Sequence, residues 1–143
     1  MSRLVVDASV AVKWFAPEIH SAAAAAVLDG PYDLCVPDLL YPEAGNVFWK
    51  KVKRGEMTAA EAAEAVDALL RLPVEVFPVG PLVPAALQLG LSTGSTVYDS
   101  VYVCLAASMR APFVTADRRL ANVQARGPLA RWVRFIDELG EPK

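Results

Sequence analysis

The sequence is poor in the side chains that most often serve nucleophilic catalysis. Its 143 residues include a single histidine, His20, and no serine or cysteine stands in an obvious triad with it. We interpret His20 as an ordinary surface residue. A metal site built on several histidines is excluded as well, because one imidazole cannot supply that ligand set.

Cysteine is nearly absent too. Cys35 and Cys104 are the only two, and both stand in strongly apolar surroundings, DLCVP and VYVCLAA. Cysteine is among the residue types most often found buried. These contexts favour buried free thiols over a disulfide, and free thiols are typical of a reducing cytoplasm.

The sequence also lacks a long apolar run, a basic excess and a glycine-rich nucleotide motif. No apolar segment approaches the roughly 20 residues that span a membrane, and the first one is broken by Asp7 and Lys13. It therefore predicts a buried strand entering a helix rather than a signal peptide. The net charge of −2 excludes binding of nucleic acid by a broad basic surface alone. Neither G-x-G-x-x-G nor G-K-[ST] occurs, which argues against dinucleotide and P-loop chemistry.

Apolar residues, in contrast, make up 55% of the chain and occur in short runs. Runs typical of strands alternate with patterns typical of amphipathic helices, which indicates a parallel sheet covered on both faces. We predict an α/β fold of three layers, a central parallel sheet of four to five strands flanked by helices, in a single domain over residues 1–143. The expected strands are 3–6, 34–36, 74–79, 113–115 and 133–136, and the expected helices are 8–14, 21–30, 38–53, 58–72, 81–91, 96–110 and a short one from 117. Two helix starts carry expected caps, which are Asp38 and the capping box of Thr58 with Glu61.

Two aspartates, Asp7 and Asp117, come directly after expected strands. Ligands of parallel sheets bind beyond the carboxyl ends of the strands, so both carboxylates should project into that crevice. Each could instead cap the helix that follows it, a common role for aspartate. The two interpretations are compatible, because a capping carboxylate can still bind a cation.

Two further acids are expected on helix faces that look inward. Glu43 lies on the apolar stripe of its helix, and because burial of a charge is costly it needs an arginine partner or a metal. Asp99 also shares a face with residues that should be buried, although a capping box with Thr96 would explain it equally well. The neighbours that define these faces are Leu39, Leu40, Val47 and Phe48 for Glu43, and Tyr102, Val103 and Ala106 for Asp99.

The four acids are more informative as a set than singly. Two carboxylates about 4 Å apart repel each other by about 4 kcal/mol at an effective dielectric near 20. A fold keeps such a cluster if a cation or protons compensate the charge. Oxygen ligands without histidine or cysteine select Mg²⁺ or Mn²⁺, and phosphoryl displacement is the chemistry that these ions serve best.

The segments that carry these acids resemble the four motifs of PIN-domain ribonucleases: VVDASVAVKWF, PEAGNVFWK, VYDSVYVCLA and FVTADRRL. They are most similar to the VapC toxins of bacterial toxin–antitoxin pairs. The similarity extends from about Leu4 to Ile136. The ordered D…E…D…D set on matching elements is more specific than any single motif.

The resemblance implies a divalent metal held mainly by Asp7, Asp99 and Asp117, with Glu43 in or beside the inner shell. It also implies hydroxyl groups that support this shell and a polar residue one turn after the glutamate that steadies it. Some relatives carry a further acid just beyond the fourth one, where this chain has arginines, so we expect one metal rather than two. The implied supporting residues are Ser9, Asn46 and Thr115, and the residues expected to contact RNA are Arg118 and Arg119.

The implied reaction is hydrolysis of an RNA phosphodiester by a metal-activated water. It leaves a 5′-phosphate and a 3′-hydroxyl and needs no histidine. Transfer RNA is the first substrate to expect, with messenger or ribosomal RNA as alternatives. The resemblance further implies a homodimer and inhibition by a VapB-like antitoxin encoded beside it. Candidate residues for a groove that receives the antitoxin are Trp14, Phe15, Trp49 and Phe48, with core packing favoured for Phe48.

Two other functions compete with this one. A phosphoacceptor receiver domain needs adjacent acids after the first strand, an aspartate after the third and a lysine after the fifth. Here the corresponding segments read DA, VFPVG and IDE, which meet none of the three requirements and argue against that function. A PIN-like binding module without catalysis stays open, although the complete set of four acids argues against it.

Overall fold

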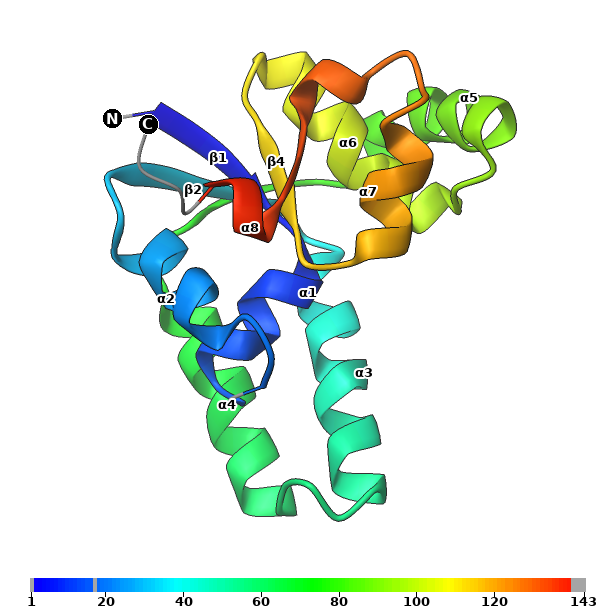
Figure 1. Cartoon of the computed structure of the whole chain (residues 1–143). Helices are drawn as coiled ribbons and strands as arrows, with labels where there is room; N and C mark the ends of the chain where they lie inside the picture. Colours follow the sequence, from blue (N-terminus) through cyan, green and yellow to red (C-terminus); the bar gives the residue numbers. More distant parts are fainter. Residues whose placement is uncertain (1, 17, 140–143) are drawn as a thin grey trace.

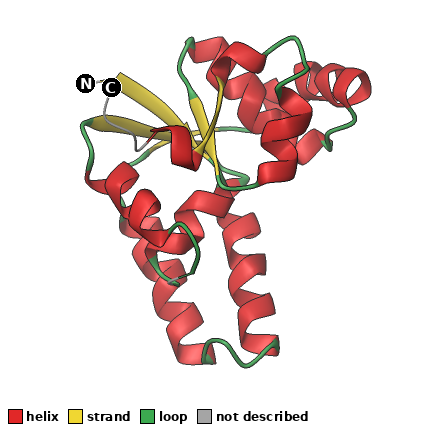
Figure 2. Ribbon diagram, in the orientation of Figure 1, coloured by secondary structure: helices red, strands yellow, loops and turns green. Residues whose placement is uncertain are grey.

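Five short parallel strands form the centre of the protein, in a computed structural model that describes residues 2–16 and 18–139. The strands are β1 (Ser2–Val6), β2 (Tyr32–Pro37), β3 (Glu75–Phe77), β4 (Phe113–Thr115) and β5 (Val133–Phe135). Their order across the sheet is β3-β2-β1-β4-β5. Helices flank this sheet (Figure 2), which confirms the predicted three-layer α/β fold.

β1 lies in the middle of the sheet and pairs with both β2 and β4. Its residues Leu4, Val5 and Val6 are completely buried, as expected of a strand covered on both faces. The chain builds outward from β1 to β2 and β3 on one side, and from β4 to β5 on the other. The order therefore reverses between β1 and β4, and such a switch point opens a crevice at the carboxyl ends of the two strands.

Helices and 3-10 turns connect the strands. They are α1 (Ala8–Ala11), η1 (Val12–Trp14), α2 (Ser21–Asp29), α3 (Leu40–Lys53), α4 (Ala59–Arg71), η2 (Gly80–Leu82), α5 (Val83–Thr93), α6 (Val97–Met109), α7 (Arg118–Gln124), η3 (Ala130–Trp132) and α8 (Ile136–Leu139). Helix α6 packs against β1, β2 and β4, whereas α7 and α8 pack against β4 and β5. Helices α3 and α4 contact each other in a hairpin that extends away from the sheet (Figure 1).

One of the two predicted helix caps is confirmed. The Thr58 hydroxyl accepts the Glu61 N–H at 3.0 Å, while the Glu61 carboxylate accepts the Thr58 N–H at 2.8 Å. The prediction for Asp38 is wrong, because its Oδ1 accepts the Val79 N–H at 3.2 Å and α3 begins later, at Leu40. β2 extends further than expected and pairs with β3 up to its last residue. This pairing draws Asp38 toward the segment that follows β3.

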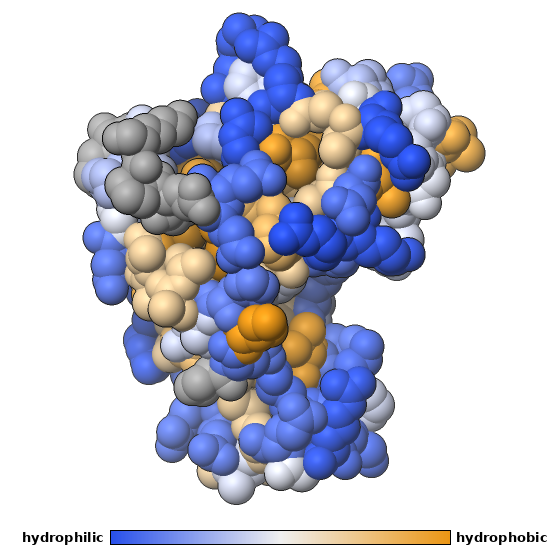
Figure 3. All heavy atoms as spheres, in the orientation of Figure 1, coloured by the Kyte–Doolittle hydropathy of each residue, from blue (hydrophilic) through white to orange (hydrophobic). Residues whose placement is uncertain are grey.

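The apolar side chains are mostly enclosed between the layers. Hydrophilic residues cover most of the face seen in Figure 3, with smaller hydrophobic areas between them. Cys35 and Cys104 are both free and buried, as predicted. Over residues 2–16 and 18–139, no helix combines the length and the apolar character needed to cross a membrane.

Candidate active site

Asp7 is the first residue after β1, and its carboxylate is buried at the switch point, with 6% of the residue exposed. It precedes α1, yet its side chain makes no capping hydrogen bond to that described helix. Its Oδ2 instead accepts two short hydrogen bonds, from the Ser9 hydroxyl at 2.6 Å and from the Thr115 hydroxyl at 2.7 Å. Both hydroxyls thus contact Asp7, while their support of a metal shell stays a prediction, and the Asp7 side chain is no helix cap.

The same hydroxyls join the ends of β1 and β4. Ser9 Oγ accepts the Ala116 N–H at 2.9 Å, and Thr115 Oγ1 accepts the Asp117 N–H at 3.0 Å. Asp117 caps α7, since its Oδ1 accepts the Leu120 N–H at 3.2 Å. Asp117 is therefore a helix cap, as the sequence allowed, and it uses one carboxylate oxygen for this bond. These hydrogen bonds fix the positions of Asp7 and Asp117 relative to each other.

Glu43 lies in the first turn of α3 and is half-buried. Its Oε1 accepts a hydrogen bond of 2.6 Å from the hydroxyl of Tyr102, a fully buried residue of α6. An arginine partner is excluded among the described residues, where no ion pair includes Glu43. Asn46 is exposed, and its expected role in steadying Glu43 stays a prediction.

Tyr102 is the site residue that the sequence did not reveal. The sequence placed it on the inward face of its helix, one turn after Asp99, without indicating that its hydroxyl meets a glutamate 59 positions away. A buried tyrosine usually finds a hydrogen-bond partner for its hydroxyl. That general rule was the only signal, and it does not name the partner.

Asp99 lies in the first turn of α6 and is partly exposed. The Thr96 hydroxyl accepts the Asp99 N–H at 3.1 Å and thereby caps the helix. Between these two described residues the return bond of a capping box, from the Thr96 N–H to the Asp99 carboxylate, is not formed, in contrast to α4. The Asp99 carboxylate therefore does not complete the cap, and Asp99 lines a small cavity together with Arg119.

The carboxyl groups of Asp7, Glu43 and Asp99 have raised pKa values, and neighbouring acids contribute to each of them. Burial raises the pKa of Asp7 to about 7, against the two hydroxyl hydrogen bonds that lower it, and the charges of Glu43 and Asp99 raise it further. Burial also raises the pKa of Glu43, with repulsion by Asp99 added. The pKa of Asp99 is raised by burial and then by Asp117, with Arg119 opposing. The structure therefore brings all four predicted acids into one electrostatic cluster.

The carboxyl groups do not converge on a single point. Within the described ranges, no three acidic, histidine or cysteine side chains are arranged to hold one metal ion directly. Mg²⁺ suits such an arrangement, because it usually keeps several waters and is bound through one or two carboxylates. An all-oxygen donor set also suits Mn²⁺. The residues present therefore fit a partly hydrated divalent ion rather than a bare ion enclosed by the chain.

An aromatic cluster borders the acids at the start of α7. The guanidinium carbon of Arg118 lies 3.6 Å from the centroid of the Phe135 ring. The His20 ring meets the same phenyl ring edge-on, and its Nδ1 lies 2.9 Å from Asp137 Oδ1. His20 is therefore a partly exposed residue at the surface, as interpreted, and it makes these two contacts there. Arg118 and Arg119 are exposed beside Asp117, and their contact with RNA stays a prediction.

Comparison with known proteins gives consistent matches over most of the chain. The family model described as PIN domain matches residues 4–126, a range that contains all four acids. Ribonuclease VapC3 of Pyrobaculum aerophilum is 33% identical over 122 residues, which make up 84% of this chain and 93% of that protein. Ribonuclease VapC1 of Mycobacterium tuberculosis is 34% identical over 125 residues, or 85% and 90% of the two chains.

Solved structures share the fold. The crystal structure of PAE2754 from Pyrobaculum aerophilum superposes with a TM-score of 0.70 at 26% identity and covers 96% of this chain and 86% of that one. A chain of a toxin–antitoxin complex from Klebsiella pneumoniae superposes with a TM-score of 0.64 at 13% identity, covering 93% and 97%. At the lower identity the likeness concerns the fold alone.

Proposed function

Since the chain belongs to the PIN-domain family, we propose that it is an endoribonuclease that hydrolyses RNA phosphodiester bonds with Mg²⁺ or Mn²⁺ bound among its four carboxylates. The observation that carries this proposal is the position of Asp7, a buried carboxylate at the switch point of the sheet, coupled to two other acids. A buried acid with a strongly raised pKa in a crevice is typical of a functional site. The names of the curated relatives support the same activity.

The chain's own residues would place the ion and the water. The two hydroxyls engage Oδ2 of Asp7, which leaves its Oδ1 for the ion, and Asp99 and Asp117 supply further charge from facing elements. The bound ion would polarise the phosphate and lower the pKa of the attacking water. Glu43 is held at Oε1 by Tyr102, and its raised pKa makes the free Oε2 a suitable acceptor for the proton of that water. The expected products carry a 5′-phosphate and a 3′-hydroxyl.

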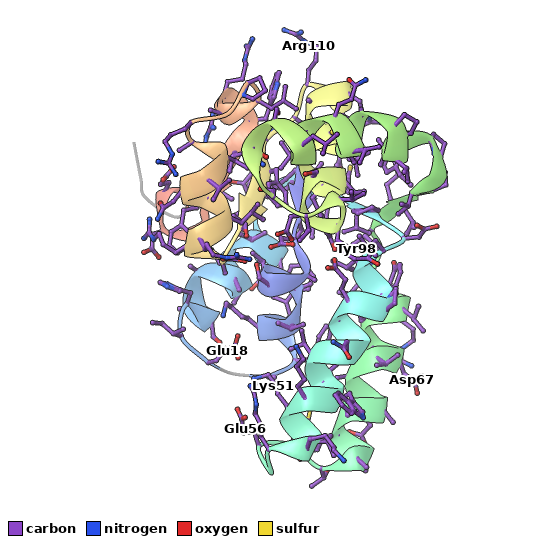
Figure 4. The ribbon with its side chains drawn as sticks, turned by 90° about the vertical axis from the view of Figure 1, so that its right-hand side faces the viewer. Glu18, Lys51, Glu56, Asp67, Tyr98 and Arg110 are labelled. Carbon is purple, nitrogen blue, oxygen red and sulfur yellow. The ribbon has the colours of Figure 1, made fainter. Side chains whose placement is uncertain are left out.

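The test is cleavage of total RNA by the purified chain, with Mg²⁺ or Mn²⁺ against excess EDTA, followed by mapping of the cut ends. We expect metal-dependent cleavage that leaves 5′-phosphates and that Asp99→Asn abolishes. Asp67→Asn is the matched control, because Asp67 is exposed on α4 (Figure 4), a helix that carries none of the four acids. Equal cleavage in excess chelator would contradict the role of the metal. RNA binding without cleavage would instead favour the binding module.

We also propose an antitoxin partner, which makes the chain the toxin of a pair. An apolar hollow lies between α3 and α4, and Trp49 at its edge is 57% exposed. Such a hollow fits the apolar side of a partner segment. Phe48 is buried beneath it, so the core packing favoured for this residue is confirmed. The residues that line the hollow are Gly45, Phe48, Trp49, Val52, Ala59, Ala62, Ala63 and Val66.

A homodimer is proposed on a different face. Val83, Leu87 and Leu91 recur every four residues on α5, and all three are exposed, Leu91 to 79%. Residues with this spacing share one side of a helix. An exposed apolar stripe of this kind is typical of a protein–protein contact. Sedimentation of the wild type against Leu87→Glu tests it, with dissociation of a dimer as the expected result and an unchanged mass as the contradicting one.

A further inference from the structure

A second group of arginines lies away from the acids, around Trp132. The guanidinium carbon of Arg131 is 4.6 Å from the centroid of the indole ring, and that of Arg110 is 5.7 Å from it. The two guanidinium groups are therefore no more than about 10 Å apart. Arg134 adjoins them through its Nη1, which donates to the Arg131 carbonyl at 2.7 Å and to the Val133 carbonyl at 3.0 Å. We call Arg110, Arg131, Trp132 and Arg134 the distal arginine surface.

The positive charge of this surface is not neutralised by acids within the described chain, whose ion pairs include none of its three arginines. Arg110 and Arg131 are exposed. Contact with an indole ring holds a guanidinium group by a cation–π interaction without using its N–H donors. Within the described residues, the guanidinium groups of Arg110 and Arg131 stay available for an anion. In a chain of net charge −2 such a concentration of arginine is a local exception.

The surface lies at the end of the sheet opposite to the acids. Arg110 follows α6 and precedes β4, and Arg131 precedes β5, so both stand at the amino ends of their strands. Two of the four acids, Asp7 and Asp117, stand at the carboxyl ends of β1 and β4. Figure 4 shows Arg110 projecting from the end of the molecule that is remote from the α3–α4 hairpin. Arg110 and Asp117 are seven positions apart in the sequence, which limits the distance between their Cα atoms to about 25 Å.

We propose that the distal arginine surface binds the phosphodiester backbone of the RNA substrate, away from the bond that is cut. This inference rests on the proposed ribonuclease function. A guanidinium group pairs with a phosphate through two parallel N–H donors, and phosphate contacts position a nucleic acid without reading its sequence. A substrate that must approach four carboxylates in an acidic protein needs attraction from elsewhere. This surface supplies it from the end of the sheet opposite to Asp7 and Asp117, so an RNA that spans both ends gains more from it than a short oligonucleotide does.

The test measures RNA affinity in EDTA, where the substrate is not cut, as a function of salt concentration. The double substitution Arg110→Gln with Arg131→Gln should weaken binding of a folded RNA roughly tenfold and reduce the slope of log affinity against log salt by about 1 to 2. Arg71→Gln is the matched control, an exposed arginine of α4 that belongs to neither site. Arg110→Lys with Arg131→Lys keeps the charges and should retain most of the slope. Melting temperatures equal to the wild type verify that the variants fold.

A second measurement separates this inference from the proposed function. The glutamine variant should cleave a short oligoribonucleotide at the wild-type rate and a folded RNA several-fold more slowly at low substrate concentration. Unchanged affinity, salt slope and cleavage of both substrates would overturn the inference while the ribonuclease function stands. Absence of cleavage by the wild type would overturn the function, and the affinity measurement would still decide the inference. If polyglutamate, and not RNA, bound through these arginines, the surface would recognise an acidic peptide and the inference would be wrong.

Discussion

At the scale of single residues, Asp7 carries the largest energetic consequence. Its pKa rises from the ordinary 3.8 to about 7, and at about 1.4 kcal/mol per unit this difference corresponds to roughly 4 kcal/mol. Removal of the charge should therefore stabilise the metal-free protein at pH 8. Because the same charge is needed to bind the metal, stability and activity conflict at this position.

The first prediction concerns Asp7→Asn. The variant should lose at least about 100-fold in RNA cleavage, and in EDTA at pH 8 it should unfold at a higher urea concentration, by up to about 4 kcal/mol in free energy. The amide oxygen can still accept the hydroxyl hydrogen bonds of Ser9 and Thr115. Asp67→Asn should change neither quantity. A variant less stable than the wild type under these conditions would contradict the burial of an uncompensated charge.

The second prediction follows from the same pKa. A raised carboxyl pKa means that the folded state binds a proton that the unfolded state has lost. This contribution to stability is complete below about pH 4 and is lost as the pH rises through about 7. In EDTA, the difference in unfolding free energy between wild type and Asp7→Asn should grow between pH 5 and pH 8. A difference independent of pH would refute it.

A third prediction concerns the hydroxyl of Tyr102, which lowers the otherwise raised pKa of Glu43. Tyr102→Phe removes this donor and keeps the ring, so we expect a loss of about 1 kcal/mol in stability. Cleavage should fall roughly tenfold, and its pH optimum should move upward as the pKa of Glu43 rises. Tyr98→Phe, at an exposed position of the same helix, is the control. If the pH profile of Tyr102→Phe were identical to that of the wild type, Glu43 would not be the proton acceptor.

At the scale of elements, the site depends on the hydrogen bonds that connect the carboxyl ends of β1 and β4. Ser9 and Thr115 bind the same carboxylate oxygen, and each also accepts a backbone N–H from the segment after β4. The two hydroxyls lie 3.3 Å apart. They should therefore act as a unit, since residues of one hydrogen-bond network are rarely independent.

The fourth prediction tests these hydrogen bonds with a double-mutant cycle. Ser9→Ala and Thr115→Val should each reduce cleavage, and the double variant should lose less than the product of the single effects, with a coupling of about 1 kcal/mol. The measurement is the rate of cleavage of one RNA by the four proteins. Fully multiplicative effects would mean that the hydroxyls support Asp7 separately.

The elements themselves were predictable where local physics decides them. The capping box of Thr58 and the apolar runs of β1 and β4 depend on neighbours in sequence, and their positions were confirmed. The predicted helix cap at Asp38 was wrong because its hydrogen-bond partner, Val79, is 41 positions away and belongs to another strand connection. The four-residue α8 went unpredicted because one turn is too short to show a helical period.

At the scale of the whole molecule, the acids could be selected from the sequence, whereas their partners could not. Glu43 stood out because a charge on an apolar stripe requires an explanation, and Asp7 and Asp117 because they follow strands. The contacts that hold them, Tyr102 to Glu43 and Thr115 to Asp7, join residues 59 and 108 positions apart. Such pairings depend on the order of strands in the sheet, which no local pattern encodes.

The most direct test of the account is Mn²⁺ binding, measured from the loss of the free-ion signal in electron paramagnetic resonance. The wild type and Asp67→Asn should each bind one Mn²⁺ at neutral pH. Asp7→Asn and Asp99→Asn should bind it at least about tenfold more weakly while they stay folded. If both variants bound Mn²⁺ as tightly as the wild type, the four carboxylates would not form the metal site, and the proposed metal-dependent function would be wrong.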